Sequence, residues 1–390
     1  MIEFTEEHEA FRGAVRRYVE EQINPRVEEW EQAGMIPLHE VFADMARLGF
    51  LGLEFDPANG GQGADHLFTL VLAEELGRVD HGSLPMAIGV QVAMATPSLA
   101  AHGSDELREA DLAPALRGEQ VASIAVTEPD AGSDVAGIRT RARRDGDDWV
   151  ISGAKTYITN GVQADWLCLL ARTSDEGGHR GMSQIIVPCD TEGVSVSRTL
   201  DKLGQRSSDT AELRFVDARV PVANTIGEIG RGFQQQMAQF QNERLIAAYM
   251  AVGDMGRAVE RTVEYLRERH AFGAPLLAQQ WIRYSLAELL AEVEVAREYN
   301  LACAEAVRDG APPRTITKMA SIAKLRAGRL QRRVADTCLQ FHGGVGYMEE
   351  TWTARYFRDS RLLSIGGGAD EVMLRVISQL EGWEDAGGAA

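Results

Sequence analysis

The feature that most constrains the fold is a change of hydrophobic pattern in the middle of the chain. From about residue 121 to 227 the sequence consists of short β-rich runs such as "VASIAVT", "WVISGAKTYITN" and "SQIIVPC". Turn signals such as "RDGDD" and "DTEGV" separate these runs. No helical pattern lies between them, so the block favours a small antiparallel barrel or sandwich over βαβ units.

On both sides of this block the apolar residues recur at helical spacing. Phe11, Val15, Tyr18 and Ile23 form one such series near the N-terminus. After the block, the long run from 232 to 270 holds few helix breakers, and further helical stretches lie near 278–308, 314–341 and 370–381. The predicted fold class is therefore α+β, with an N-terminal all-helical domain (1–120), a middle β domain (121–227), a C-terminal four-helix bundle (228–382) and a flexible tail (383–390).

The charge and composition of the chain narrow its partners. Lys and Arg number 40 and Asp and Glu 58, which gives a formal net charge of −18. Such an acidic protein is a poor match for nucleic acid or an anionic membrane. The N-terminus, "MIEFTEEHEAFR", has neither the apolar core of a signal peptide nor the composition of a transit peptide. The four cysteines lack a CxxC motif, which predicts free thiols and no metal site. We expect a cytoplasmic protein with no nucleic-acid or membrane partner.

Two motifs of the β block carry hydroxyl and aromatic side chains. In "AVTEPDAGSD", Thr127 and Ser133 bracket a turn and are placed to bind the polar edge of a ligand, although such turns are also ordinary connections. In "KTYITNG", Tyr157 and Thr159 alternate with Ile158, so a regular strand would put the ring and the hydroxyl on one face. That face suits a flat, hydrogen-bonding heterocycle, and it also suits an ordinary solvent-facing strand.

Three more motifs lie between predicted helices. "RHAFGAPLLAQQ" offers Arg269, which can hold a phosphate. "QFHGGVGYMEE" is rich in glycine, but it follows a helix and lacks the third glycine of a dinucleotide-binding fingerprint. "SIGGGADEVM" contains three consecutive glycines, 366 to 368, before a helix that Asp370 can cap. These glycines form a permissive turn or leave room for a bound group.

Taken in order, these motifs resemble the acyl-CoA dehydrogenase family of flavoproteins. The matching segments are "TEPDAGSD", "TYITNG", "KLGQRSSDTAEL", "GRGFQQQM", "RHAFGAPLLAQQ", "QFHGGVGY" and "GGGADEVM", over roughly residues 1–382. The resemblance implies the fold predicted above and FAD-dependent α,β-dehydrogenation of an acyl-CoA to the trans-2-enoyl-CoA. It also implies electron transfer to an electron-transferring flavoprotein, a branched-chain or medium- to long-chain substrate, and a homo-oligomer built as a dimer of dimers.

The resemblance also implies a set of site residues. FAD would lie between the β domain and the C-terminal helices, with Thr159 near flavin N5, and Gln340, Gly343 and Gly344 would complete a neighbouring subunit's site. The implied cofactor contacts are Val126, Thr127, Ser133, Tyr157, Ile158, Thr159, Arg269, Phe272, Gln280, Gln340, Gly343, Gly344, Ala369 and Glu371. The implied substrate contacts are Ser133, Asn242, Arg244, Gly367 and Gly368.

The catalytic carboxylate departs from the commonest family pattern. Many members carry it in the loop where this chain has Gly367. The isovaleryl-type and long-chain-type branches carry it on the first long helix of the bundle, before an Arg-Leu pair, where this chain has Glu243. A glutamate beside Arg244 is often only a surface residue, but the apolar flanks Phe240 and Leu245 indicate burial. We predict that Glu243 is the base, with its pKa raised by burial, and that the backbone N–H of Gly367 polarises the thioester carbonyl.

Two other functions fit the same resemblance. One is an oxygen-using flavin oxidase on this fold, which the length of the chain and the use of Glu in place of Asp disfavour. The other is a non-catalytic flavin-binding relative, which the acidic charge and the lack of a basic C-terminal extension disfavour. Reduction of the flavin by an acyl-CoA distinguishes the non-catalytic relative from a dehydrogenase, and peroxide formation in air distinguishes the oxidase.

Overall fold

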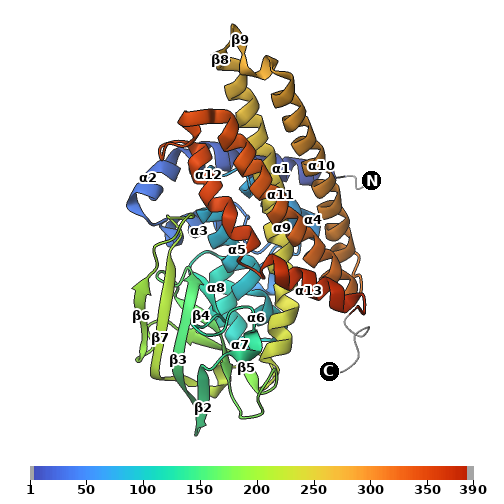
Figure 1. The fold of residues 1–390 in the computed structure, drawn as a ribbon. Coiled ribbons are helices and arrows are strands. Elements are labelled where there is room, and N and C mark those ends of the chain that lie inside the picture. The colour runs from blue at the N-terminus through green and yellow to red at the C-terminus, as the bar shows by residue number, and fades with distance from the viewer. Residues whose placement is uncertain (1–3, 384–390) are drawn as a thin grey trace, which may run out of the picture.

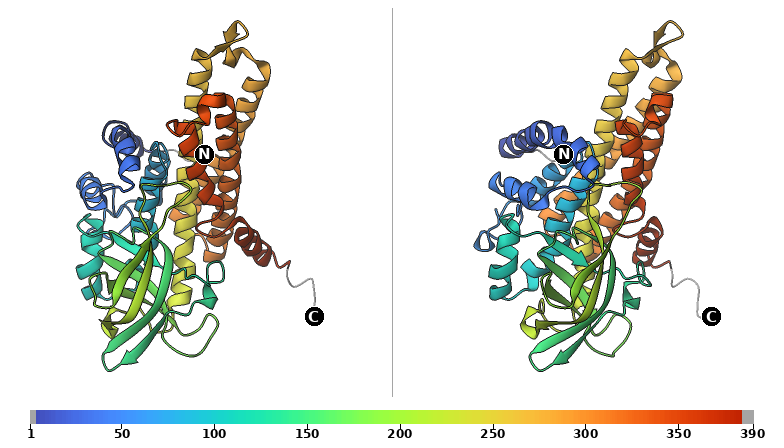
Figure 2. Two further views of the ribbon diagram at one scale, coloured as in Figure 1. Left: turned by 60° about the vertical axis from the view of Figure 1, so that its left-hand side comes forward. Right: turned by 90° about the vertical axis from the view of Figure 1, so that its left-hand side faces the viewer.

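The structure is a computed structural model that describes residues 4–383. Residues 384–390 of the predicted flexible tail lie outside the described residues. In the view of Figure 1 the first N-terminal helices lie above the β sheet, and the long C-terminal helices run beside both (Figures 1 and 2). The predicted order of helical, β and helical segments is confirmed.

The N-terminal part consists of short helices linked by single turns of π- and 3-10 helix. The first helix begins with a capping box, in which Thr5 and His8 each accept a hydrogen bond from the other's backbone N–H. The apolar series predicted there is buried at Val15, Tyr18 and Ile23. The α-helices are α1 (Glu6–Tyr18), α2 (Val27–Ala33), α3 (Leu38–Arg47), α4 (His66–Leu76), α5 (Ser83–Gly89), α6 (Pro97–His102), α7 (Asp105–Leu107) and α8 (Ala113–Leu116).

One stretch of this part, Ser83–His102, is long and apolar enough by length and composition to cross a membrane. In the fold 72% of its most apolar 18-residue window is buried inside the protein. Its polar Gln91 is fully buried and donates to the backbone carbonyls of Ala115 and Gln120. The burial shows that this stretch packs as a core helix of the domain.

The β domain is one seven-stranded sheet with the order β1-β4-β2-β3-β7-β6, and β5 pairs with β4 (Figure 2). Most neighbours are antiparallel, as predicted, but β1 runs parallel to β4, and β2 is parallel to β4 at Arg141 and Arg172. The prediction of a purely antiparallel sheet is wrong here because β4 inserts between β1 and the β2–β3 hairpin. The strands are β1 (Ala122–Ala125), β2 (Arg141–Asp145), β3 (Asp148–Thr159), β4 (Trp166–Arg172), β5 (Met182–Pro188), β6 (Val194–Thr199) and β7 (Thr210–Pro221).

The C-terminal part is helical, as predicted. Three of its helices are long, and two short ones follow. A small hairpin joins the first two long helices at the end farthest from the β domain (Figure 1). The elements are α9 (Gly232–Glu268), β8 (His270–Ala271), β9 (Ala274–Pro275), α10 (Gln280–Arg308), α11 (Pro313–Gly346), α12 (Trp352–Ser360) and α13 (Asp370–Leu380).

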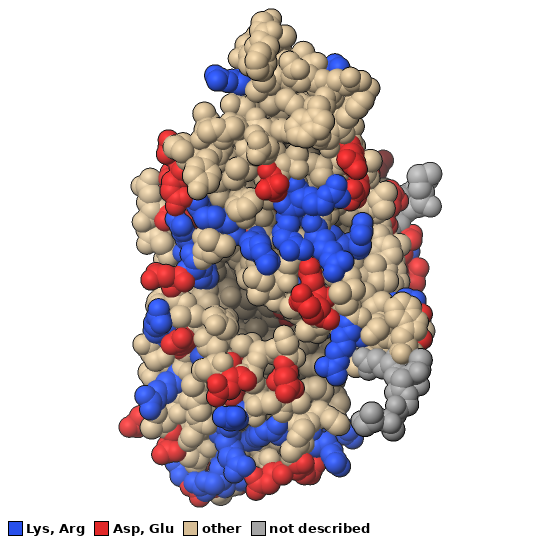
Figure 3. All heavy atoms as spheres, in the orientation of Figure 1, with Lys and Arg blue, Asp and Glu red and all other residues tan. Residues whose placement is uncertain are grey.

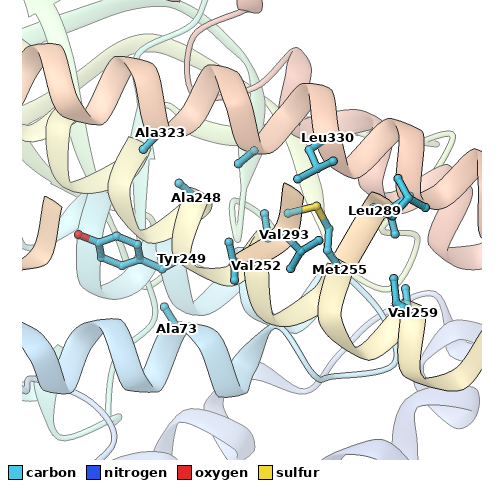
Figure 4. Packing of buried hydrophobic residues seen from close by; sticks show 14 of the residues in the cluster. Ala73, Ala248, Tyr249, Val252, Met255, Val259, Leu289, Val293, Ala323 and Leu330 are labelled. Atoms are coloured by element: carbon cyan, nitrogen blue, oxygen red, sulfur yellow. The ribbon is translucent and has the colours of Figure 1, made fainter. Parts of the chain in front are cut away.

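The largest hydrophobic core joins the two helical parts (Figure 4). Buried side chains of α9 such as Val252 and Met255 pack between α10 and α11, with Leu289, Val293 and Leu330 around them. Helix α4 of the N-terminal part contributes residues to the same core. The helical parts therefore share one packed body, which holds α9 rigidly beside the β domain.

Candidate active site

The carboxylate of Glu243 lies against the glycine loop before α13. A Cβ atom placed on Gly367 would stand 2.9 Å from Glu243 Oε1, closer than real Cβ atoms approach such an atom. The backbone of Gly367 has φ +63°, a conformation that residues with side chains rarely adopt. Two observations thus disfavour a side chain at 367: the backbone conformation would be strained, and the carboxylate of Glu243 occupies the space and would have to move.

Burial controls the electrostatics of Glu243. Its side chain is only partly exposed, and burial raises the pKa of the carboxyl from the usual value to about 7. The positive charges of Arg244 and Lys324 oppose this rise. A carboxyl with this pKa gains and loses its proton near neutral pH, as a general base must.

Lys324 is a member of this site that the sequence analysis missed. It lies on α11, is 1% exposed, and its Nζ donates to the carbonyl of Gly368. Burial lowers the pKa of Lys324 to about 8, against the opposing charges of Asp370 and Glu243. The sequence does contain a pattern that indicates the burial of Lys324. In the run "ASIAKLRAG", Ala320, Ala323 and Ala327 mark a buried helix face on which Lys324 also lies.

Arg244 borders the same loop. It is 6% exposed, its Nη1 donates to Gln241 Oε1 at 3.2 Å, and its guanidinium lies over the Phe240 ring. Its Nε has no partner among residues 4–383. A Cβ on Gly368 would stand 3.9 Å from this guanidinium and 2.6 Å from Met373 Cε. Gly368 is therefore enclosed by α9 and α13.

The acids that follow the glycines have different surroundings from those predicted. Asp370 is the first residue of α13 and makes no side-chain cap, so its predicted capping role is wrong. Its carboxylate accepts from Arg332 of α11 at 3.2 Å, with Arg329 at 3.5 Å. Ala369 is partly exposed and Glu371 exposed. Asp370 ties the loop to α11 and leaves Glu243 as the acid beside Gly367.

A buried ion pair fixes the first motif of the β domain. Lys155 Nζ donates to Glu128 Oε1 at 2.9 Å and to the Val126 carbonyl at 2.8 Å. The Glu128 carboxylate also accepts the backbone N–H groups of Arg139 and Thr140. This pair holds both ends of the turn, so the backbone around Val126 is rigid.

The residues offered by this turn differ in exposure. Val126 is buried and packs near Phe233 in the first turn of α9. Thr127 is partly exposed, and Ser133 is fully exposed. The turn thus lies where the sheet meets α9.

The second β motif is not a regular strand. The pairing of β3 with β7 shifts between Lys155 and Ile158, and Tyr157 has φ +59°. The Tyr157 ring is 70% exposed, Ile158 is buried, and Thr159 is partly exposed. The simple alternation predicted for this motif is interrupted by the bulge, which pushes the aromatic ring out into solvent.

The remaining predicted residues lie elsewhere. The hairpin with Phe272, which is 95% exposed, stands at the end of the α9–α10 pair, away from the β domain (Figure 1). The last turns of α11 reach the same end, where Phe341 packs edge to face on Trp281. The predicted residues at this end are exposed: Arg269, Phe272, Gln280, Gln340, Gly343 and Gly344. We call these six residues the tip cluster.

The surface of the molecule has a hollow where the β domain meets the C-terminal helices (Figure 3). In the orientation of Figure 1, a hollow opens between the β domain and the C-terminal helices, with Lys and Arg side chains gathered above it (Figure 3). The distances given above show that a single chain brings Glu243, Arg244, Gly367 and Gly368 together. Asn242 is exposed beside them, and the tip cluster lies apart.

A three-part fold with a partly exposed carboxylate against a glycine loop is consistent with an oxidoreductase that acts on acyl-CoA, and comparisons with known proteins identify the family. The descriptions "Acyl-CoA dehydrogenase, N-terminal domain", "middle domain" and "C-terminal domain" match residues 5–119, 123–218 and 230–380. The chain belongs to the acyl-CoA dehydrogenase family, and it is an acyl-CoA dehydrogenase of fatty acid metabolism, acting on CH–CH donors.

Individual relatives span nearly the whole chain. The probable acyl-CoA dehydrogenase YngJ of Bacillus subtilis is 35% identical over 97% of this chain and 98% of its own length. The mitochondrial long-chain specific acyl-CoA dehydrogenase of Rattus norvegicus is 35% identical over 96% of this chain and 86% of its own. The crystal structure of a putative acyl-CoA dehydrogenase from Mycobacterium smegmatis matches with a TM-score of 0.94 at 40% identity, covering 98% of this chain and 99% of that one.

Proposed function

We propose that Glu243 removes the α proton of an acyl-CoA thioester whose β hydrogen leaves as hydride. The observation that carries this proposal is the contact between Glu243 and Gly367. The carboxylate enters from α9 into the space that a loop side chain would fill. Its pKa of about 7 suits proton removal near neutral pH.

The glycine loop supplies the second contribution. The backbone N–H of Gly367 is proposed to donate to the thioester carbonyl, which stabilises the negative charge that builds up as the α proton leaves. A backbone donor needs no side chain, so glycine retains this role. Lys324 holds the loop through the Gly368 carbonyl, and Asp370 holds it through Arg332. Both contacts fix the position of the donor relative to Glu243.

The residues of the cleft fit FAD, the cofactor that the family typically binds. The exposed Tyr157 ring offers a flat surface near the C-terminal end of β3, two residues from the hydroxyl of Thr159, and Lys155 of the same strand binds the rigid turn at Val126. We propose that Val126, Thr127, Ser133, Tyr157, Ile158 and Thr159 hold the flavin end, with Ala369 and Glu371 nearby. When bound, FAD supplies the hydride acceptor.

We propose that the tip cluster holds the other end of FAD, in part across a subunit boundary. Phe272 is exposed, and so are Trp281 and Tyr284 at the start of α10. Aromatic residues are enriched at interfaces, so this group supports a contact with another chain. Arg269 would pair with a phosphate, with Gln280 beside it. Gln340, Gly343 and Gly344 would serve a second copy of the chain. This arrangement supports at least a dimer and is consistent with a dimer of dimers.

The substrate and the electron acceptor are part of the proposal. A relative named for long-chain substrates is 35% identical to this chain, and this supports a medium- to long-chain or branched acyl-CoA. We propose an electron-transferring flavoprotein as the acceptor.

The test is anaerobic mixing of the FAD-containing protein with a panel of acyl-CoAs, followed by the flavin absorbance. We expect rapid bleaching with longer or branched chains. A protein that cannot be loaded with FAD, or whose flavin no acyl-CoA reduces, would contradict the proposal. Stoichiometric peroxide formation in air would instead favour the oxidase.

A further inference from the structure

A second feature of the molecule lies beyond the base. A cavity runs between the stretch Ser83–His102, α9 and α12. Ala247, one helical turn after Glu243 on the same face of α9, lines it, and so do Met250 and Ala251 of the next turn. Glu243 itself does not line the cavity, which begins about one helical turn beyond it along α9, at Ile246 and Ala247.

The part of the cavity nearer Glu243 is apolar. Besides the α9 residues, Met86 and Met94 line it from the Ser83–His102 stretch, and Leu363 lines it from the segment after α12. Methionine side chains adapt to chains of different shape. An alkyl chain fits these surroundings.

The inner part of the cavity is polar. Asp254 lies about three helical turns after Glu243, about 16 Å along the axis at 1.5 Å per residue. Its Oδ2 accepts from Gln331 Nε2 at 2.5 Å. Burial raises the pKa of Asp254 well above its usual value, which favours the uncharged acid. A purely alkyl substrate gains nothing from these polar groups.

Besides His81 Nε2, two polar atoms that line this cavity have no hydrogen-bond partner among residues 4–383. They are Gln331 Oε1 and the Tyr356 hydroxyl. Gln331 is 6% exposed and Tyr356 is 8% exposed, and both line the cavity. Buried polar atoms are normally paired, so two open ones in one cavity point to a ligand or water that completes them.

The nearby charges restrict which group can do so. The carboxylate of Asp80 is paired with Arg261 at 2.6 Å, and Asp359 accepts the backbone N–H groups of Gly82 and Gln205. Arg257 also lines the cavity. Acidic and basic groups thus stand on both sides, and a free carboxylate or ammonium would meet a like charge. The open acceptor on Gln331 and the open donor on Tyr356 together match a neutral hydroxyl group.

We propose that the acyl chain of the substrate carries a hydroxyl group toward its distal end, which accepts from the Tyr356 hydroxyl and donates to Gln331 Oε1. Gln331 and Tyr356 then act as specificity residues. This inference rests on the proposed function, because it assumes that the acyl chain enters the cavity past Glu243. Water is the alternative occupant, and the experiment below separates the two.

The test uses the FAD-containing protein and two acyl-CoAs of equal chain length, one ending in a methyl group and one bearing a terminal hydroxyl. The measurement is kcat/KM with an artificial electron acceptor. We expect the wild-type protein to favour the hydroxylated substrate by about tenfold or more, since a pocket built to hydrogen-bond a hydroxyl rejects the analogue that lacks it. Tyr356→Phe and Gln331→Met should each reduce this preference by about tenfold.

Tyr18→Phe is the matched control, because Tyr18 is also 8% exposed but lies in the N-terminal core. It should leave the preference unchanged. Because the preference is a ratio, a partial loss of folded protein does not alter it. Equal use of both substrates by the wild-type protein, unaffected by Tyr356→Phe, would mean that only water fills the site and would overturn this inference. Failure of both substrates to reduce the flavin would contradict the proposed function itself.

Discussion

The catalytic cleft and the tip cluster represent two ways of building a site. In the cleft, Glu243, Lys324 and the glycine loop come from three separate segments, and the fold of one chain brings them together. The tip cluster is exposed, and its most prominent side chain, Phe272, packs on little of its own chain. The proposed base is thus positioned within one chain, whereas we propose that a second copy of the chain completes the tip cluster. Changes in the cleft should affect chemistry, and changes at the tip should affect cofactor retention.

The largest expected effect comes from putting a carboxylate on both sides of the cleft. Gly367→Glu forces a side chain into the space held by Glu243 and into a left-handed backbone conformation. We expect the rate of flavin reduction by acyl-CoA to fall by ~1000-fold or more, since misplacement by 1 Å alone can cost ~100-fold. Stopped-flow absorbance measures this rate.

The compensating double change sharpens this test. Glu243→Gly combined with Gly367→Glu moves the carboxylate to the other side and removes the clash. We expect partial recovery at best, with an altered acyl preference, because the new carboxylate approaches from a different direction. A Gly367→Glu protein that reduces its flavin at the wild-type rate would show that the contact with Glu243 is not functional.

An intermediate effect is expected at the tip. Arg269→Ala removes the proposed phosphate contact, and a hydrogen bond to a charged group contributes about 1.5–3 kcal/mol. FAD retention should therefore weaken by about ten- to a hundredfold, while molecules that keep FAD react at the normal rate. The measurements are FAD dissociation on dilution and the rate per bound flavin.

Arg267→Ala is the control for the tip, because Arg267 is an exposed arginine in the last turn of the same helix. It should retain FAD like the wild-type protein. If Arg269→Ala retained FAD fully but slowed the bleaching of bound flavin, the proposal that the tip cluster retains the cofactor while the cleft carries out the chemistry would be wrong.

A smaller effect is expected from Lys324. Its charge lowers the pKa of Glu243, so Lys324→Met should raise that pKa. Because the base acts as the carboxylate, the acidic limb of the kcat/KM profile should move to higher pH. Activity should fall several-fold at about pH 6.5 and little in alkaline solution, where Lys324 itself is losing its charge. Lys318→Met, which alters an exposed lysine on the same helix, should leave the profile in place. An unshifted profile in Lys324→Met would exclude Lys324 from the electrostatics of the site.

The order of the domains could be predicted from the sequence because it depends on local patterns. The assignment of Glu243 as the base came from the resemblance to the acyl-CoA dehydrogenase family, and the apolar residues beside it supported the assignment. Strand and helix periodicities show in short windows. The glycine at 367 showed that the loop had no carboxylate, and this directed attention to α9. The contact between Glu243 and Gly367 then agrees with that interpretation.

Other features depend on contacts between distant segments, which a single sequence does not display. The parallel pairing of β1 with β4 is one of them. The bulge at Tyr157 is set by the register between β3 and β7. Lys324 resembled an ordinary helix lysine until the fold placed it beneath Gly368. The open polar atoms of Gln331 and Tyr356 are visible only once the cavity has formed.

The most direct test of the central claim is the reduction of flavin by acyl-CoA in the Glu243→Gln protein. The amide is nearly isosteric, so FAD and acyl-CoA binding should persist, and the rate of bleaching should fall by ~10²–10⁴-fold. Glu264→Gln, an exposed position on the same helix, should bleach at the wild-type rate. Bleaching of the Glu243→Gln flavin at close to the wild-type rate would contradict the assignment of Glu243 as the base and direct the search to Asp370 and Glu371.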